Sequence, residues 1–157
     1  IQVLHRFDRS RSVDLGASSM TRRDRELARA DNVRYVGAAI AAIKEQIEVV
    51  EPLAFFGFSQ GTAMAYRAAA GAGHPGQGLV ALGGDVPTDV LEGGLESFPK
   101  VLIGRGTEDE WYDEGKMERD LDLLGTVGVE PEVCVFDGGH EFGAEFCRVA
   151  GRFLNAL

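Results

Sequence analysis

The stretch LAFFGFSQGTAMAYRAAA, residues 53–70, decides the fold. Its first six residues are apolar or glycine and predict a buried β-strand, whereas residues 62–70 are rich in alanine and free of glycine and proline, which predicts a helix. Between them, residues 57–61 have the sequence GFSQG and match the pattern GxSxG. A strand, a tight turn with Ser59 at its tip and then a helix are typical of a nucleophilic serine held above a parallel sheet.

The rest of the chain repeats this alternation of short apolar segments and helical patterns. Further strands are expected at 1–7, 79–82, 101–103 and 133–136, and further helices at 31–50, 114–124 and 142–154. The pattern predicts an α/β fold, a mostly parallel sheet with helices on both faces. Asp31 is the expected N-cap of the first helix. A chain of 157 residues is long enough for one domain, so residues 1–157 are expected to form a single catalytic domain.

Composition excludes several classes of function. The net charge of −9 would repel nucleic acid over most of the surface, and no apolar run approaches the roughly 20 residues of a membrane span. Cys134 and Cys147 fall in an expected strand and helix, which favours two buried thiols over a disulfide and predicts a cytoplasmic protein. No metal-ligand spacing or phosphate-binding motif occurs in the sequence, so no metal or cofactor is predicted.

Two further residues complete a candidate catalytic site. A serine is a poor nucleophile near neutral pH unless a base activates it, and the base requires an acid that orients it. Asp109 and His140 each follow an expected strand, so they should lie at the carboxyl edge of the sheet together with Ser59. The sequence predicts Ser59 as nucleophile, His140 as general base and Asp109 as orienting acid. Asp85 follows the preceding strand and stays open as an alternative acid.

Residues next to the triad are candidates for supporting roles. The backbone N–H of Gln60 lies at the start of a helix, where unpaired N–H groups and the helix dipole favour a developing oxyanion. Gly57 and Gly61 flank the serine and are expected to relieve steric strain at the turn. Trp111 and Tyr112 directly follow the aspartate. They are candidates for the wall of a substrate pocket, with simple packing as the alternative.

Four segments resemble motifs of the α/β hydrolase superfamily, and within it the carboxylesterase/phospholipase-like branch that includes acyl-protein thioesterases. They are GFSQG at 57–61, LGGDVP at 82–87, GTEDEWY at 106–112 and GGHEF at 138–142. The resemblance covers the chain from about residue 53 to its end. It implies a cofactor-free hydrolase acting through a Ser-His-Asp triad and an acyl-enzyme. The implied substrate is a small carboxylic ester or thioester, neutral or modestly anionic.

The sequence also departs from that family. Its members normally supply a second oxyanion donor from an HGxG-type loop after the third strand, and no such motif occurs in these 157 residues. By resemblance, RFD at 6–8 corresponds to the turn after the fourth strand. The first three strands are therefore expected on residues that precede Ile1 or on a separate, complementary segment, and a homodimer is a further expectation.

Two other functions stay open at this point. Without the oxyanion loop, the chain would be a hydrolase-fold binding or regulatory module with impaired catalysis. With the same triad, it would be a serine peptidase, because that triad also cleaves peptide bonds.

Overall fold

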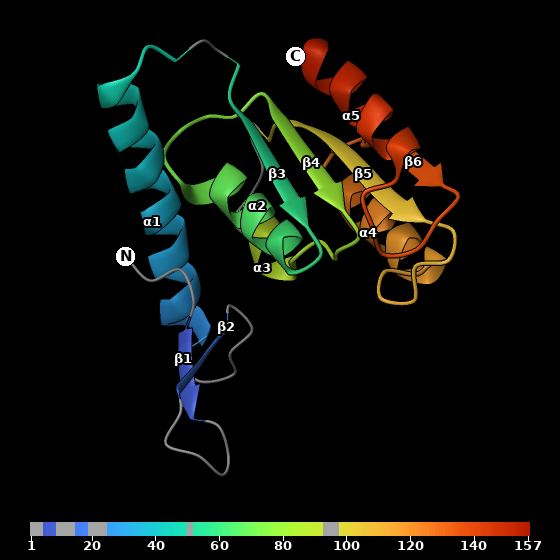
Figure 1. Cartoon of the computed structure of the whole chain (residues 1–157), viewed down its shortest axis with the longest axis horizontal. Helices are drawn as coiled ribbons and strands as arrows, with labels where there is room; N and C mark the ends of the chain where they lie inside the picture. The colour runs from blue at the N-terminus through green and yellow to red at the C-terminus, as the bar shows by residue number, and fades with distance from the viewer. Residues whose placement is uncertain (1–4, 9–14, 19–24, 50–51, 93–97) are drawn as a thin grey trace.

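The computed structural model describes residues 5–8, 15–18, 25–49, 52–92 and 98–157 of the chain. Its elements are, in order, β1 (His5–Asp8), β2 (Leu15–Ser18), α1 (Arg25–Gln46), β3 (Ala54–Phe58), α2 (Gln60–Gly71), β4 (Gly78–Leu82), α3 (Thr88–Leu91), β5 (Lys100–Gly106), α4 (Glu114–Thr126), β6 (Glu132–Phe136) and α5 (Ala144–Asn155). Strands β3 to β6 form a parallel sheet in the order β3-β4-β5-β6 (Figure 1). The described helices do not include one with both the length and the apolar character needed to cross a bilayer.

The two central strands, β4 and β5, are buried on both faces. Every residue of β4 is buried, and its side chains alternate between two cores. Leu79 and Ala81 pack with the side chains of α2 and α4, whereas Val80 and Leu82 pack with those of α5. This alternation follows from the two-residue period of a strand. The predicted α/β fold, with a mostly parallel sheet and helices on both faces, is confirmed.

Helix α2 lies directly against the sheet because its residues are small. Ala65 and Ala68 are buried in the same core as Leu79, and the helix contacts both β3 and β4. Small side chains permit the helix axis to approach the strands closely. The start of α2 is thereby fixed next to the carboxyl ends of β3 and β4, where the sequence predicts the site.

Helix α1 differs from its predicted boundaries at both ends. It begins at Arg25, so Asp31 lies inside the helix and the prediction that it is the N-cap is wrong. The residues before Asp31 are mostly good helix formers, and Ala28 is buried, which explains the earlier start. Toward the other end the helix stops short of the prediction, and Ile43 and Ile47 are exposed. Val36 and Ile40, earlier in the same helix, are partly buried against the core.

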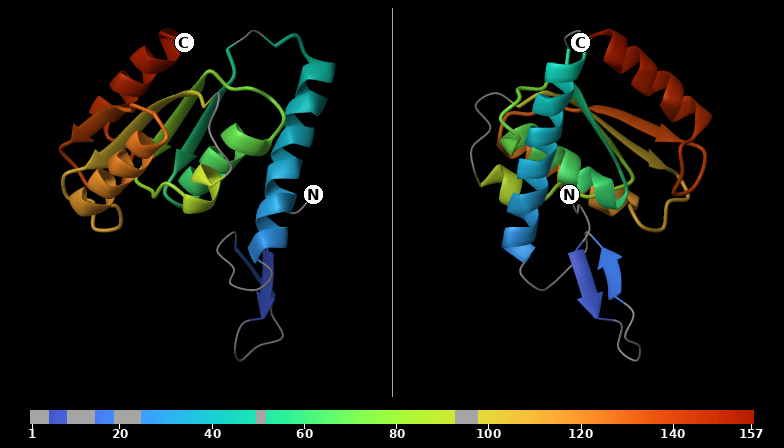
Figure 2. Two further views of the ribbon diagram at one scale, coloured as in Figure 1. Left: turned by 180° about the vertical axis from the view of Figure 1, so that it is seen from behind. Right: turned by 60° about the vertical axis from the view of Figure 1, so that its left-hand side comes forward.

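The first strand has a different partner from the one expected. Residues 5–8 pair antiparallel with residues 15–18 and form a two-stranded sheet of their own, so β1 is not part of the parallel sheet. Residues 1–4 of the predicted strand lie outside the described residues. Pairing with a neighbouring segment closes only a short loop, which costs less entropy than a distant partner. Figure 2 shows this hairpin beyond one end of α1, away from the parallel sheet.

Strand β3, which precedes Ser59, lies at the edge of the described parallel sheet and pairs with β4 alone. Phe56 on this strand is 49% exposed and stacks on the exposed Phe142. Phe142 was predicted to lie in the last helix, but that helix begins at Ala144, so the prediction is wrong. The expected complementary segment and the expected homodimer stay predictions.

The two cysteines differ in their environment. Both are free thiols, but Cys134 is buried and Cys147 is exposed. The prediction of two buried thiols is therefore wrong for Cys147. The buried face of α5 is formed by Phe146, Ala150 and Phe153, and a residue next to Phe146 along the helix turns away from that face.

Candidate active site

Ser59 occupies a strained turn between β3 and α2. Its φ is 53° and its ψ is −121°, and among the described non-glycine residues it is the only one with a positive φ. Such a conformation costs on the order of 1–3 kcal/mol and persists only where the surrounding contacts enforce it. Here the N–H of Ser59 donates to the carbonyl of Leu82 at 2.8 Å, and its own carbonyl accepts from Thr62 N–H at 3.0 Å. The turn is therefore held from both sides.

Two glycines make room for this turn. A Cβ atom on Gly57 would lie 2.6 Å from the carbonyl oxygen of Gly61, and one on Gly84 would lie 2.4 Å from the carbonyl oxygen of Ser59. The predicted steric need at Gly57 is thus present. At Gly61 the structure differs from the prediction, because an added Cβ would meet no atom of the described residues within 4 Å. The second position that requires a glycine is Gly84, in the loop after β4.

Asp109 and His140 are joined by a hydrogen bond. His140 Nδ1 and Asp109 Oδ2 lie 2.8 Å apart, and the Asp109 side chain is 1% exposed. The other carboxylate oxygen, Oδ1, accepts from the backbone N–H groups of Trp111 at 2.8 Å and Tyr112 at 2.9 Å. The carboxylate is therefore fixed by its own loop on one side and by the imidazole on the other.

These contacts set the protonation of the pair. Burial by itself would raise the pKa of Asp109, but hydrogen bonds from Tyr112 N–H, from His140 and from Trp111 N–H hold that pKa below its ordinary value of 3.8. The carboxylate is thus ionised near neutral pH and acts as an acceptor. His140 Nδ1 must carry the proton, which leaves Nε2 free to accept another. This is the tautomer that a general base requires.

The loops that carry the aspartate and the histidine are bonded to each other. Glu108 N–H donates to the carbonyl of Gly138 at 2.8 Å. Gly106 permits this approach, because a Cβ there would lie 2.2 Å from the carbonyl oxygen of Gly138 and 2.3 Å from that of Gly139. The backbone thus fixes the relative position of the two loops, and with it the Asp109–His140 pair.

The imidazole of His140 is placed by rings and by a glycine. It packs against Phe58, the residue before the serine, with 4.8 Å between the ring centroids, and Phe58 in turn packs against Phe142 at 4.6 Å. On another side, a Cβ on Gly83 would lie 3.0 Å from Cε1 of His140 and 3.1 Å from its Nδ1. Gly83 also has a φ of +62°. A glycine is needed here for conformation and for space.

Ser59 and His140 line one cavity of about 510 Å³. Its lining residues come from α2, the loop after β4, the loop after β5, α4 and the loop after β6: Ser59, Gln60, Ala63, Gly83, Gly84, Asp85, Trp111, Lys116 and His140. The volume lies in the range of small-molecule sites. Within the described part of the chain, the hydroxyl of Ser59 forms no hydrogen bond with a protein group. Ser59 and His140 therefore share a pocket without a direct hydrogen bond between them.

The other predicted site residues fall into two groups. Gln60 is the first residue of α2, so its N–H has no intrahelical acceptor, and it lines the cavity. Trp111 also lines the cavity and is 74% exposed. Tyr112 is instead 1% exposed and lies in the core, where its hydroxyl donates to Asp120 at 3.1 Å. Tyr112 therefore supports the aspartate loop and is not part of the cavity wall.

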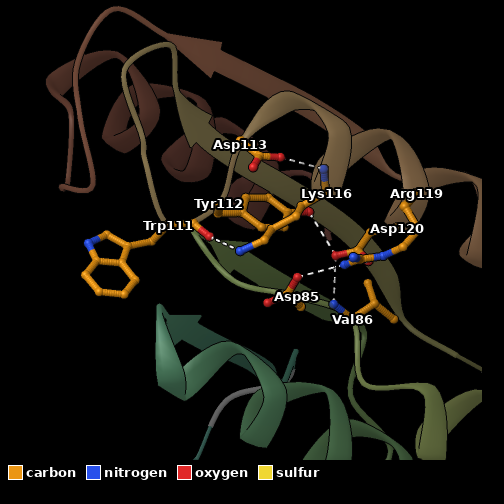
Figure 3. Close-up of polar contacts among 8 residues, drawn as sticks. All are labelled: Asp85, Val86, Trp111, Tyr112, Asp113, Lys116, Arg119 and Asp120. Carbon is orange, nitrogen blue, oxygen red and sulfur yellow. Dashed lines mark hydrogen bonds and ion pairs between the residues drawn. The ribbon is translucent and has the colours of Figure 1, made fainter.

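Asp85, the alternative acid, has a different partner. Its carboxylate accepts from Arg119 at 2.7 Å, whereas Asp109 bonds to the histidine. Arg119 also binds the fully buried Asp120, and Asp120 accepts from the N–H of Val86 at 2.8 Å (Figure 3). Burial raises the pKa of Asp120. Through Asp120 and Arg119, helix α4 connects the loop after β4 to the loop that carries Asp109.

Sequence reasoning missed Lys116, which lines the cavity from the first turn of α4. Its ammonium group donates to the backbone carbonyl of Trp111. The side chain of Asp113 caps the same helix by accepting from Lys116 N–H at 2.9 Å. No motif marks this lysine. The sequence pattern does not specify which side chains of α4 reach the cavity.

Solved structures similar to this one include an esterase, SOBER1 and an acyl-protein thioesterase. Esterase PE8 superposes with a TM-score of 0.69 at 25% identity, over 90% of this chain and 70% of its own. SOBER1 from Arabidopsis thaliana gives a TM-score of 0.65 at 23% identity, over 83% and 65% of the two chains. Acyl-protein thioesterase 2 from Zea mays gives 0.63 at 20% identity, over 99% and 71%.

The similarity is one of structure. No family model matches the sequence, and neither does a curated protein. The chain spans between 65% and 71% of the lengths of these three structures. At such identities the superpositions establish the fold, and the chemistry has to be argued from the residues of the site.

Proposed function

We propose that this chain, which has an α/β hydrolase fold of the acyl-protein thioesterase-like type, is a serine hydrolase that cleaves carboxylic esters or thioesters. One observation carries the proposal. The strained Ser59 and the Asp109-bonded His140 line the same cavity, although they come from distant parts of the chain. The structural similarity to an esterase and to an acyl-protein thioesterase supports hydrolase chemistry in general.

In the first half of the proposed reaction, the hydroxyl oxygen of Ser59 attacks the carbonyl carbon of the substrate. Nε2 of His140 accepts the hydroxyl proton as the new bond forms, and the ionised Asp109 stabilises the imidazolium. The tetrahedral intermediate then expels the alcohol or thiol, which takes its proton from His140. An acyl group remains on Ser59 as an ester.

In the second half, water takes the place of the alcohol or thiol. The oxygen of the water attacks the carbonyl carbon of the acyl-enzyme while His140 removes a proton from the water. His140 then returns the proton to the oxygen of Ser59 as the acid is released. Ser59 and His140 thereby return to the protonation states in which the reaction began. Throughout, Asp109 keeps its charge and holds the imidazole in one tautomer, so its contribution is orientation and electrostatic stabilisation.

The negative charge on the carbonyl oxygen requires a donor in both halves. The N–H of Gln60 is suited to this role, since it stands at the start of α2, where the helix dipole favours negative charge. It also lines the cavity beside Ser59. One oxyanion donor of this kind is worth on the order of 10²–10³ in kcat.

Covalent labelling provides the direct test of the nucleophile. A fluorophosphonate probe should label the folded chain, and digestion followed by mass spectrometry should locate the label at Ser59. Ser59→Ala should remove both the label and the turnover of p-nitrophenyl acetate, with a loss of about a millionfold in kcat for a complete triad. A folded chain that neither reacts with the probe nor hydrolyses the ester would overturn the proposal.

A histidine pair tests the base. His140→Gln should abolish labelling and turnover. His74→Gln is the matched control, because His74 forms a hydrogen bond with the backbone carbonyl of Gly37, at 3.1 Å, and does not line the cavity. Equal effects of the two substitutions would argue against a specific role for His140. Comparison of p-nitrophenyl acetate with an aminoacyl p-nitroanilide then separates ester from amide cleavage.

A further inference from the structure

Among the described residues that line the cavity, one is a cation whose charge is not balanced by a carboxylate. Three of its lining side chains carry or acquire charge: Asp85, Lys116 and His140. Asp85 accepts from the guanidinium of Arg119 at 2.7 Å, and His140 bonds to Asp109. Within the described residues, Lys116 forms no ion pair. The positive charge of Lys116 is therefore available to a ligand.

Lys116 is held in place by a contact that leaves it available. Its side chain extends from α4 toward the carbonyl of Trp111, as Figure 3 shows, and donates one hydrogen bond there. An ammonium group has three donors, so two remain. Asp113 caps α4 with its carboxylate on the backbone N–H of Lys116, and its side chain is not paired with the ammonium group.

The cavity is large enough to hold both ends of a small ester. Both Ser59 and Lys116 line its volume of about 510 Å³. A carbonyl carbon at Ser59 and an anionic group at Lys116 can therefore belong to the same molecule. The net charge of −9 makes most of the surface unfavourable for anions. An anionic ligand therefore needs a local cation inside the cavity.

We propose that Lys116 binds a carboxylate carried by the ester substrate, so that the site prefers half-esters of dicarboxylic acids, or esters of a carboxylate-bearing alcohol, over neutral esters. This inference rests on the proposed function and names its substrate class. Lys116 is a specificity-determining residue here. It takes no part in the transfer of the acyl group or of a proton.

Paired substrates test the proposal on the intact chain. Mono-p-nitrophenyl adipate carries a carboxylate on the acyl group, and methyl p-nitrophenyl adipate is its neutral counterpart. 4-Acetoxybenzoate and its methyl ester form the corresponding pair on the leaving-group side. In at least one pair, Lys116→Gln should lower the ratio of kcat/KM for the anionic ester to that for the neutral ester by about tenfold, the effect of losing one charge-assisted hydrogen bond. The pair that responds identifies the side of the ester that carries the anion.

Lysine variants separate charge from support of the loop. Lys116→Arg should retain the ratio, and Lys116→Glu should lower it below that of Lys116→Gln. Lys100→Gln is the matched control, because Lys100 also donates to a backbone carbonyl, that of Ala156, but lies at the start of β5 and outside this cavity. A purely structural role for Lys116 would lower the kcat/KM of both esters equally and leave the ratio unchanged. That result would overturn the proposal.

A binding measurement makes the test independent of turnover. Trp111 is the only tryptophan of the chain and lines the cavity, so its fluorescence reports on occupancy. In the Ser59→Ala variant, monomethyl adipate should change this fluorescence at lower concentration than dimethyl adipate. In the double variant that also carries Lys116→Gln, the difference should disappear. Binding without a preference for the anion overturns the inference on Lys116. If Lys116 controls a preference for the anionic ester but the wild-type chain does not hydrolyse esters, the proposed function is overturned instead.

Discussion

The loops that follow β4 and β5 leave adjacent parallel strands, and each carries an aspartate near the same cavity, yet the two carboxylates have different partners. The side chain of Asp109 is 1% exposed and bonds to His140, whereas the side chain of Asp85 is 53% exposed and pairs with Arg119. Position at a strand end therefore does not determine the role of a residue. The determining factor is what the rest of the loop does: backbone N–H groups hold Asp109 toward the histidine loop, and helix α4 holds Asp85 away from it.

Asp109→Asn should produce the largest effect. The asparagine amide would donate toward His140 Nδ1, so the proton would move to Nε2 and the imidazole would no longer act as a base. We expect kcat for p-nitrophenyl acetate to fall by about 10⁴-fold with little change in KM. Steady-state kinetics measures this. A loss of less than tenfold would mean that another group orients the histidine.

Gly83→Ala should have the next largest effect, because Gly83, in the loop after β4, lies against the hydrogen-bonded pair of Asp109 and His140. The new Cβ would lie 3.0 Å from His140 Cε1 and 3.2 Å from Asp109 Oδ2, so the imidazole has to move. Misplacement of a catalytic group is expected to lower kcat by about 10²-fold. Gly73→Ala is the control: Gly73 has a φ of +74° but an open surrounding, so it should lose stability without losing activity. Equal losses of activity would contradict this explanation.

The hydrogen-bonded pair of Asp109 and His140 also contributes to the stability of the fold, and this contribution depends on pH. The pKa of Asp109 is held below its ordinary value, so its contribution is complete above about pH 4 and is lost as the pH falls through the lowered pKa. At neutral pH, Asp109→Asn should lower the free energy of unfolding by about 1.5–3 kcal/mol, the effect of one buried hydrogen bond to a charged group. Urea unfolding of both proteins from neutral to acid pH should show this difference shrink. A difference independent of pH would exclude the charge as its source.

The contrast between the two loops also explains what the sequence could predict. Ser59, Asp109 and His140 each follow a short apolar strand at a glycine-rich turn, so local pattern and parallel topology are enough to place them at one edge. The choice of Asp109 over Asp85 needs contacts between loops, such as Glu108 N–H with the carbonyl of Gly138. Local sequence does not encode such contacts.

Features that depend on distant packing were predicted less well. The sequence pattern does not show that Lys116 lines the cavity, or that Tyr112 turns into the core, where the buried Asp120 accepts its hydroxyl. The partner of β1 was missed for a different reason: the sequence pattern does not mark residues 15–18 as a strand, and β1 pairs with this neighbouring segment. Periodicity identifies an element, and packing decides what it contacts.

Asp85→Asn should have the smallest effect and therefore gives the sharpest test of the contrast. Its ion pair with Arg119 is about half exposed on both sides, and pairs of this kind contribute about 0.2–1 kcal/mol. Because Asp85 does not contact His140, turnover of a neutral ester should stay within about threefold of the wild type, and the free energy of unfolding should fall by less than about 1 kcal/mol. Steady-state kinetics and urea unfolding measure the two quantities. If Asp85→Asn instead abolished turnover while Asp109→Asn left it intact, the loop after β4 would supply the orienting acid, and the assignment of the two carboxylates would be reversed.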